Sequence, residues 1–294
     1  MDIIQKLQYK LLQTKYSAKS IFSSADCIII NSVCHPHGFD LMKENWGDDI
    51  NMIIPNLISG KEVIPYNLLF PSIRNSQVTN YMCIGSIINW MTNSKSVIWG
   101  SGAICNTIPI QAKPKKVTAV RGPLTRDFLI KSGVSCPNVY GDPALLLPLY
   151  YNPICSNRHH IGIIPHISDR SSSVIKELRR MSNTTFIDLG NYDSNWKSVI
   201  DKINSCEIIV SSSLHGLIIA EAYGIPNVWV SIDNNIIGGE FKYQDFFKSI
   251  KQERSPILLT TDNLSKDFID NCALMWRKSK INLTDQLLDS CPFI

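Results

Sequence analysis

The sequence predicts an α/β protein built from two Rossmann-like domains. A chain of 294 residues is long enough for two compact domains. Over residues 161–231, short runs of apolar, β-branched residues alternate with helical stretches, which is typical of βαβ units in a parallel sheet. The polar stretch 152–160 has almost no apolar periodicity and separates this region from a less clear but similar first half. We therefore predict an N-terminal domain over 1–152 and a C-terminal domain over 153–294.

Composition excludes several classes of protein. Apolar residues make up 44% and charged residues 18%, which excludes a disordered, collagen-like or coiled-coil chain. No apolar run approaches the length of a membrane span, and no basic segment followed by an apolar one marks a signal peptide. A net charge of +4 is too small for a nucleic-acid footprint but suits an anionic substrate. We expect a cytoplasmic protein without a nucleic-acid partner.

The nine cysteines predict neither disulfides nor a metal site. Their number is odd and no C-x-x-C occurs, so free thiols in a reducing compartment are expected. Cys34 lies near His35 and His37, but one cysteine and two histidines make an incomplete ligand set. We therefore predict no metal.

In the first half, apolar spacing predicts a helix over residues 1–19. Its lysines would also permit contact with an anionic membrane surface, although packing against the sheet is the simpler interpretation. A second helix is expected over 123–131, with Pro123 in its first turn and Gly133 after its end. A shorter helical pattern covers 50–58, and strands are expected over 25–30, 81–84, 96–99 and 117–120.

In the second half, strands are expected over 161–164, 185–189, 208–211 and 227–231. Helices are expected between them, over 171–181, 196–204 and 217–223. A final helix over 264–278 is expected to pack back across both halves.

Ligands of open parallel sheets bind beyond the carboxyl ends of the strands. The strand 208–211 runs into serines and then Leu214 and His215, at a strand-to-helix turn where hydroxyls and helix amides can bind an anion. His166 follows strand 161–164 at an equivalent place. The alternative is that each histidine only braces its turn. We favour a functional role for His215 and leave His166 open.

Arg121 ends a buried strand just before a Gly-Pro helix start. A buried arginine is costly unless it meets an anion, and its planar fork suits a carboxylate or phosphate. The alternative is pairing with a structural carboxylate such as Asp142; we favour the ligand. The turn Gly100, Ser101 and Gly102 could cradle an anion with its backbone amides or could only be a tight turn.

The segment Asn45-Trp-Gly-Asp-Asp49 precedes a helical pattern. Asp48 or Asp49 could cap that helix. A carboxylate at this place could also act as a general base for a hydroxyl. The residues alone leave both interpretations open.

Taken in order, these segments resemble the polysaccharide pyruvyl transferase family. Each motif is short, but together they run in the family's order from about residue 40 to 250. The matching pieces are Asn45-Trp-Gly-Asp48, Ile84-Gly-Ser86, Trp99-Gly-Ser-Gly102, Val120-Arg-Gly-Pro-Leu-Thr-Arg126, Tyr140-Gly-Asp-Pro-Ala-Leu-Leu-Leu-Pro148, Ile164-Pro-His166, Ser211-Ser-Ser-Leu-His-Gly-Leu217, Ala220-Glu-Ala-Tyr-Gly-Ile-Pro226 and Phe241-Lys-Tyr243.

The resemblance implies two Rossmann-like domains facing a cleft, as in GT-B glycosyltransferases, with the acceptor side in the first domain and the donor side in the second. It implies transfer of pyruvate from phosphoenolpyruvate to sugar hydroxyls, usually as a cyclic ketal, in capsule, exopolysaccharide or cell-wall synthesis. Phosphoenolpyruvate would be a co-substrate, and no cofactor is implied. The saccharide acceptor could be free or lipid-linked, and in the second case the enzyme would visit the inner membrane face.

On this interpretation His215 is the general acid, protonated near neutral pH, and Asp48 is a candidate base. The family often has arginine directly before Leu-His, where this chain has Ser213, so Arg121 or Lys242 would supply the missing cation. Asn45 and Asp49 are expected at the acceptor. The donor is expected to contact Arg121, Gly100, Ser101, Gly102, Ser212, Ser213, Leu214, His166 and Lys242.

Two alternatives remain open from the sequence. A GT-B-like glycosyltransferase with a nucleotide-sugar donor would need a ribose-binding glutamate late in the chain. Glu221 and Glu240 are available, but neither has the expected local context. A carbohydrate-binding protein that has lost catalysis is the second alternative, against which the intact His215 and Arg121 argue.

Overall fold

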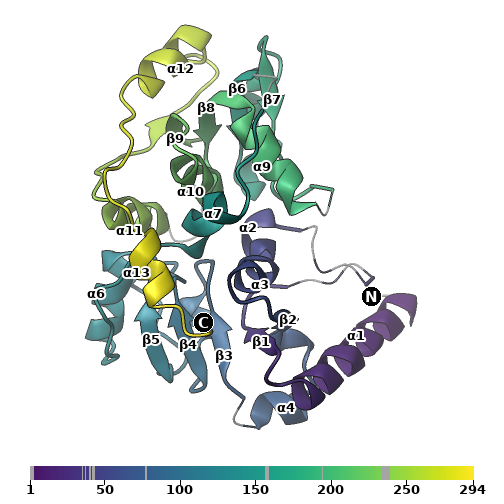
Figure 1. Ribbon diagram of the computed structural model, residues 1–294. Coiled ribbons are helices and arrows are strands. Elements are labelled where there is room, and N and C mark those ends of the chain that lie inside the picture. The colour runs from purple at the N-terminus through teal and green to yellow at the C-terminus, as the bar shows by residue number, and fades with distance from the viewer. Residues whose placement is uncertain are drawn as a thin grey trace.

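The structure is a computed structural model that describes residues 3–34, 36, 38–39, 41, 44–76, 78–155, 159–193, 195–232 and 239–294. It contains two five-stranded sheets, one in each half of the chain, and every strand pair in them is parallel (Figure 1). The predicted α/β class is therefore confirmed.

The two sheets share one topology. The first has the order β2-β1-β3-β4-β5 and the second β10-β9-β8-β6-β7, so each sheet, numbered within its own half, has the order 2-1-3-4-5. In this doubly wound order the ligand site is expected where the first and third strands meet. The strands are β1 (Cys27–Ile30), β2 (Glu62–Pro65), β3 (Asn80–Met82), β4 (Ser96–Trp99), β5 (Lys116–Ala119), β6 (His159–Ile164), β7 (Thr184–Phe186), β8 (Cys206–Ser211), β9 (Asn227–Ser231) and β10 (Ile257–Leu258).

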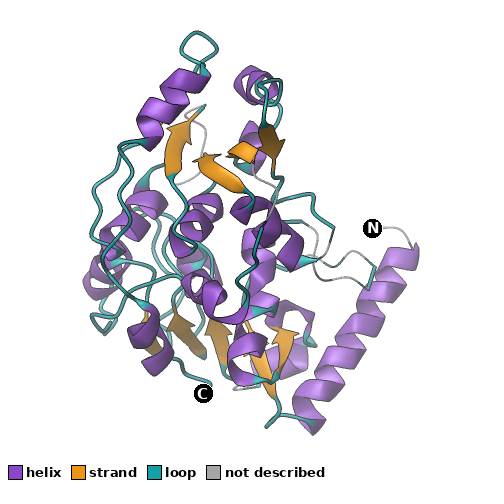
Figure 2. Ribbon diagram, turned by 45° about the horizontal axis from the view of Figure 1, so that its top comes forward, coloured by secondary structure: helices purple, strands orange, loops and turns teal. Residues whose placement is uncertain are grey.

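Helices cover the sheets and fill the space between them. Figures 1 and 2 show two groups of strands, with α2, α7 and α10 between them. The α-helices are α1 (Ile3–Phe22), α2 (Trp46–Asp49), α3 (Ile54–Ser59), α4 (Pro71–Asn75), α5 (Ile88–Met91), α6 (Pro123–Lys131), α7 (Leu147–Tyr150), α8 (Ser173–Leu178), α9 (Trp196–Asn204), α10 (Leu214–Ala222), α11 (Phe241–Ser249), α12 (Lys266–Ala273) and α13 (Thr284–Asp289). Short 3₁₀ turns are η1 (Ile50–Met52), η2 (Tyr66–Leu68), η3 (Pro143–Leu146) and η4 (Ile167–Asp169).

The largest apolar cluster contains residues of both halves. Trp46 and Trp99 from the first half and Ile164, Leu217 and Phe246 from the second are among its buried members. Smaller clusters line β6, β8 and β9 with α8 and α12 in the second half, and β3, β4 and β5 with α6 in the first. The two sheets therefore pack onto a common core, and the boundary after residue 152 stays a prediction.

The chain returns to its first half near the C-terminal end. The predicted helix over 264–278 was too long: α12 covers only Lys266–Ala273 and packs against the second sheet. The return is made by α13, where Trp99 Nε1 donates a hydrogen bond to the Leu287 carbonyl oxygen at 2.9 Å. Phe293 then lies edge-on to the rings of Trp99 and Tyr81.

Candidate active site

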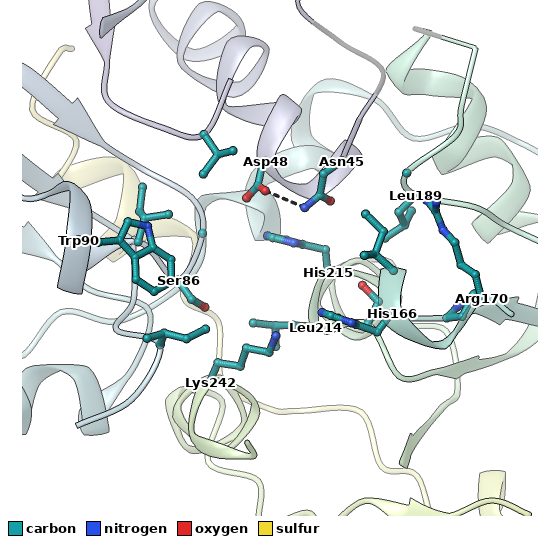
Figure 3. Close-up of a pocket in the computed structure, with 18 residues that line it drawn as sticks. Asn45, Asp48, Ser86, Trp90, His166, Arg170, Leu189, Leu214, His215 and Lys242 are labelled. Carbon is teal, nitrogen blue, oxygen red and sulfur yellow. Dashed lines mark hydrogen bonds between the residues drawn. The ribbon is translucent and has the colours of Figure 1, made fainter. Parts of the chain in front are cut away.

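A cavity of about 180 Å³ lies where the two sheets face each other. It is lined by the segments that follow the carboxyl ends of β1, β3, β6 and β8, which are the first and third strands of each sheet (Figure 3). Both positions at which a doubly wound sheet is expected to bind a ligand therefore open into one cavity. The lining residues in these segments are Val33, Gly85–Ile87, Pro165–Ile167 and Ser213–His215.

His215 occupies the first turn of α10 and lies near the middle of the cavity, with Asp48 and Asn45 on one side and Lys242 and His166 on the other (Figure 3). Its ring rests on the backbone of Gly47, where an added Cβ would lie 2.0 Å from the His215 Nδ1. The buried His215 Nε2 has no hydrogen-bond partner among the described residues. This position confirms the predicted strand-to-helix placement.

The predicted protonation of His215 near neutral pH is wrong for this structure. Burial, together with the charges of Arg121 and Lys242, lowers the pKa of His215 to about 3. The imidazole is therefore neutral at pH 7. Its charge state depends on what else enters the cavity, because an anion would offset the two neighbouring cations.

Lys242 and Arg170 bring positive charge to the cavity wall. Lys242 projects from α11 with only 8% of its surface exposed, and burial lowers its pKa to about 8. Arg170 forms an ion pair with Asp188 at 2.5 Å and crosses Gly190, where an added Cβ would lie 1.8 Å from its guanidinium nitrogen. The sequence analysis missed Arg170, although it follows strand β6 in the same loop as His166.

The start of α10 adds backbone donors. Its N-cap Ser213 forms no side-chain cap, and the first amides of any helix have no partner within the helix. Ser213 and Leu214 line the cavity, and their contact with the donor stays a prediction. The N-terminus of this nine-residue helix therefore favours negative charge at the same place as the two cations.

Asp48 is the acidic group of the cavity. Asn45 caps α2 by accepting a hydrogen bond from the Gly47 amide at 3.3 Å, and its Nδ2 donates to Asp48 Oδ2 at 2.7 Å. Burial and the charge of Asp49 raise the pKa of Asp48 to about 7. Asn45 and Asp48 both line the cavity, so a carboxyl that exchanges a proton near neutral pH lies beside His215.

Asp49 does not line the cavity, contrary to its expected place at the acceptor. It is buried, and its Oδ2 accepts hydrogen bonds from the Tyr192 hydroxyl at 2.8 Å and the Asn45 amide at 3.2 Å. Because Tyr192 follows the second sheet's strand β7, Asp49 ties α2 to the other half of the protein.

Arg121 lies behind the cavity wall, which corrects its expected role as a direct donor contact. It is only 1% exposed, and its Nε donates to Asp245 Oδ2 at 3.0 Å. Its two terminal nitrogens donate to the Ser86 hydroxyl at 2.6 Å and to the Ala103 carbonyl oxygen at 2.8 Å. Arg121 therefore pairs with a structural carboxylate, as the alternative had it, but the partner is Asp245 and not Asp142. It affects the cavity by holding the lining residue Ser86 and by lowering the pKa of His215 through its charge.

The Gly100–Gly102 turn is structural and lines no part of the cavity, which corrects its expected donor contact. Gly100 has φ +95°, and an added Cβ would lie 2.2 Å from the Pro143 ring. Gly102 carries the Arg121 guanidinium, whose Cζ would lie 2.2 Å from an added Cβ. Ser101 is completely buried.

Ser212 and His166 differ in position: His166 lines the cavity and Ser212 does not. Ser212 is buried outside the lining, where its hydroxyl donates to Asp169 at 2.6 Å and accepts from the His166 amide at 2.9 Å. Ser212 therefore positions the His166 loop instead of contacting the donor. His166 lines the cavity, and burial with the Lys242 charge lowers its pKa. Its Nδ1 lies 2.8 Å from the Ser168 hydroxyl.

The first half supplies an apolar wall that the sequence analysis missed. Trp90 of α5 lines the cavity and is 39% exposed, beside Val33, Ile87 and Ile104. Figure 3 shows Trp90 on the side of Ser86, across the cavity from Arg170.

The two glutamates considered for a nucleotide-sugar lie outside the cavity lining. Glu221 Oε1 accepts hydrogen bonds from Asn227, Arg254 and Trp276 at 2.7 to 3.0 Å, so this carboxylate is already engaged. Glu240 is exposed at the start of α11.

Within the described ranges, no group of three or more His, Cys, Asp or Glu side chains is arranged to hold a metal ion, and all nine cysteines are free. His35 and His37, which were considered as metal ligands together with Cys34, lie outside the described residues. None of the described helices has the length and apolar character needed to cross a membrane.

Residues 93–234 match the family model of polysaccharide pyruvyl transferases. This segment contains Arg121, Arg170 and His215. The predicted resemblance to the polysaccharide pyruvyl transferase family is confirmed. Asp48, Trp90 and Lys242, which complete the cavity, lie outside the pyruvyl transferase match.

Two curated relatives are similar to this chain. An uncharacterized protein of Acanthamoeba polyphaga mimivirus is 31% identical over 185 residues, covering 60% of this chain and 61% of the relative. The succinoglycan biosynthesis protein ExoV of Rhizobium meliloti is 27% identical over 225 residues, covering 73% of this chain and 64% of the relative. The chain thus spans less than two thirds of either relative.

Among solved structures, an uncharacterized protein from Klebsiella pneumoniae aligns with 89% of this chain and all of its own. Its sequence identity is 15% and the TM-score is 0.42.

Proposed function

We propose that this protein transfers pyruvate from phosphoenolpyruvate to hydroxyls of a saccharide acceptor in polysaccharide biosynthesis. The observation that carries the proposal is a small cavity in which Lys242, Arg170 and a helix N-terminus surround His215, while Asp48 faces them. In this proposal the sheets belong to two Rossmann-like domains in a GT-B-like arrangement, with the donor on the side of the second sheet.

The cavity suits a small anionic donor. Drug-sized ligands occupy about 300–1,000 Å³, whereas this cavity measures about 180 Å³. Phosphoenolpyruvate carries a phosphate and a carboxylate, both of which bind cations and helix N-termini. Lys242 and Arg170 supply the positive charge that family members place at the position of Ser213.

Donor binding would also protonate His215. Burial and, to a smaller extent, the cations Arg121 and Lys242 hold its pKa low in the structure. The negative charge of phosphoenolpyruvate would offset them, so the pKa of His215 rises and its ring takes up a proton. A histidine that is neutral before the donor binds would thus become an acid beside it.

The proton then moves from His215 to the methylene carbon of phosphoenolpyruvate, which creates cationic character at C2. The first acceptor hydroxyl forms a C–O bond to C2 and loses its proton to the Asp48 carboxylate. Phosphate leaves with the electron pair of its bond to C2 and takes the proton from Asp48, so that it departs as inorganic phosphate and the carboxylate is regenerated. The second hydroxyl closes the ketal and returns a proton to the neutral His215.

The acceptor would enter along the apolar wall. Sugar rings present C–H faces that pack on aromatic side chains, and the half-exposed Trp90 offers such a surface beside Ser86 and Asp48. In this arrangement the acceptor hydroxyls would point toward Asp48. The polymer could be a capsule, an exopolysaccharide or a cell-wall polysaccharide.

The test measures phosphoenolpyruvate binding by thermal shift, and phosphate release with saccharide acceptors. Lys242→Gln should abolish the stabilisation, whereas His215→Gln should keep it and lose transfer by about 10²-fold or more. Lys248→Gln is the matched control, because this exposed lysine lies on the same helix and outside the cavity.

Equal binding of phosphoenolpyruvate by the Lys242 and Lys248 variants would show that the donor does not use this cavity. Stabilisation by a nucleotide-sugar instead of phosphoenolpyruvate would assign a glycosyltransferase.

A further inference from the structure

Helix α1 packs on the protein through one side only. Leu12 and Tyr16 are buried against Ile64 and Leu68, and the Ser17 hydroxyl accepts a hydrogen bond from the Phe70 amide at 2.9 Å. These contacts hold α1 along the outer edge of the first sheet, beside β2 (Figure 1).

The opposite side of α1 is also apolar. At 100° per residue, its exposed apolar side chains fall within a sector of about 100°, centred opposite Leu12 and Tyr16. Leu7 is 60% exposed, Leu11 50% and Phe22 86%. We call the large exposed apolar side chains of this sector the outer face of α1: Ile3, Ile4, Leu7, Leu11, Ile21 and Phe22. Thr14 falls in the same sector, and its hydroxyl donates to the Lys10 carbonyl oxygen at 3.0 Å.

Lysines border the outer face on both edges. On the same helical projection, Lys6 and Lys10 fall along one edge and Lys15 and Lys19 along the other, while the helix Ile3–Phe22 contains no Asp or Glu. Lys19 pairs with Glu62 at 2.5 Å, and Lys6, Lys10 and Lys15 are exposed. An apolar sector between two rows of lysines is the pattern of a helix that lies in the plane of an anionic lipid surface.

Charge disfavours a second copy of the chain as the occupant. Two outer faces packed together would bring four rows of lysines to one seam, with no carboxylate on either helix to pair with them. Anionic lipid headgroups, by contrast, would complement Lys6, Lys10 and Lys15, the border lysines other than the Glu62-paired Lys19.

We propose that α1 docks the protein on an anionic lipid bilayer, with its outer face in the boundary between headgroups and acyl chains. This docking requires no membrane-spanning segment and is independent of the donor cavity.

Flotation with lipid vesicles tests the proposal. The full chain should bind vesicles of phosphatidylglycerol mixed with phosphatidylcholine and should not bind vesicles of phosphatidylcholine alone. Leu7→Gln with Leu11→Gln should weaken binding at least about tenfold, because two leucine side chains that would enter the lipid are lost. Lys6→Gln with Lys10→Gln should weaken it by about tenfold or more and reduce its sensitivity to salt.

The matched control is Leu274→Gln with Met275→Gln, which removes two exposed apolar side chains far from α1 and should leave vesicle binding unchanged. All of these side chains are exposed, so the melting temperature should stay near that of the wild type. The proposal is wrong if the wild type does not float with the anionic vesicles. It is also wrong if the Leu7→Gln with Leu11→Gln variant and the Lys6→Gln with Lys10→Gln variant both float as well as the wild type. It is also wrong if the outer face instead mediates a dimer that Leu7→Gln with Leu11→Gln dissociates.

Discussion

Asp48 and His215 both line the cavity, and burial shifts the pKa of each side chain in the direction that favours its uncharged form. The pKa of the carboxyl rises to about 7 and that of the imidazole falls to about 3. Paired groups with displaced pKa values are how active sites assign acid and base roles. In the proposed function, the bound donor anion raises the pKa of His215 again, which lets the imidazole act as the acid and Asp48 as the base.

The pH profile of transfer tests the role of Asp48. Since Asp48 accepts a proton only when ionised, the rate should rise as pH increases through about 7 and fall above about 8, where Lys242 loses its charge. Asp48→Asn should lower kcat/KM by about 10²–10⁴-fold and remove the rising limb. Phosphate release measured across this pH range gives the profile, and a rising limb that persists in Asp48→Asn would assign it to another group.

Stability supplies the control for the same variant. A carboxyl whose folded pKa lies above its unfolded value favours folding below the unfolded pKa, and this contribution is lost as pH rises through the folded pKa. At alkaline pH, Asp48→Asn should therefore melt at a temperature equal to or above that of the wild type, so that lost activity cannot be attributed to unfolding.

Single residues show where sequence reasoning succeeds and fails. His215 could be placed because a strand-to-helix turn is a local pattern. Arg121 could be recognised as a buried cation that needs an anion, but its partner Asp245 lies 124 positions away. Only tertiary structure could show that this carboxylate, and not a ligand, satisfies the guanidinium.

At the scale of elements, α6 and α11 meet at one contact that positions Lys242. Asp245 of α11 accepts hydrogen bonds from Arg121 and from the Thr125 amide and hydroxyl. Gly122 lies directly beneath, where an added Cβ would be 1.9 Å from the Asp245 carbonyl oxygen. Lys242 lies one helical turn before Asp245, so this contact fixes the helix that brings the lysine to the cavity.

Gly122→Ala should push α11 away from α6. We expect a loss of about 1–3 kcal/mol in the free energy of unfolding, as for other overpacked sites, together with weaker phosphoenolpyruvate binding. Denaturant unfolding and thermal shift with the ligand measure the two effects. The control is Lys131→Ala, at the exposed end of α6, which should change neither the free energy of unfolding nor the affinity for phosphoenolpyruvate. If Gly122→Ala leaves that affinity unchanged, the position of α11 does not affect donor binding.

Element patterns predicted four of the five strands in each sheet, because those strands are apolar runs bounded by polar turns, and missed the edge strands β2 and β10. β10 is only two residues long, and β2 ends in Pro65, which is unusual within a sheet. Such a strand is tolerated because β2 lies at the sheet edge, where a missing amide donor costs little.

At the scale of the whole molecule, the shared core should couple the two halves in unfolding. Trp46 of the first half donates a hydrogen bond from Nε1 to the Trp196 carbonyl oxygen of the second at 3.1 Å. We expect one calorimetric transition that coincides with the change in tryptophan fluorescence. Two resolved transitions would mean that the halves unfold independently despite this contact, which no sequence pattern could predict.

The hydrogen bond between Trp99 and Leu287 also sets an order of events during synthesis. The two residues are 188 positions apart, which corresponds to roughly 10–40 s of translation at the usual rate. Throughout that interval the Trp99 indole on the first sheet lacks the partner and cover that α13 provides. The nascent first half therefore keeps this aromatic surface uncovered until α13 leaves the ribosome.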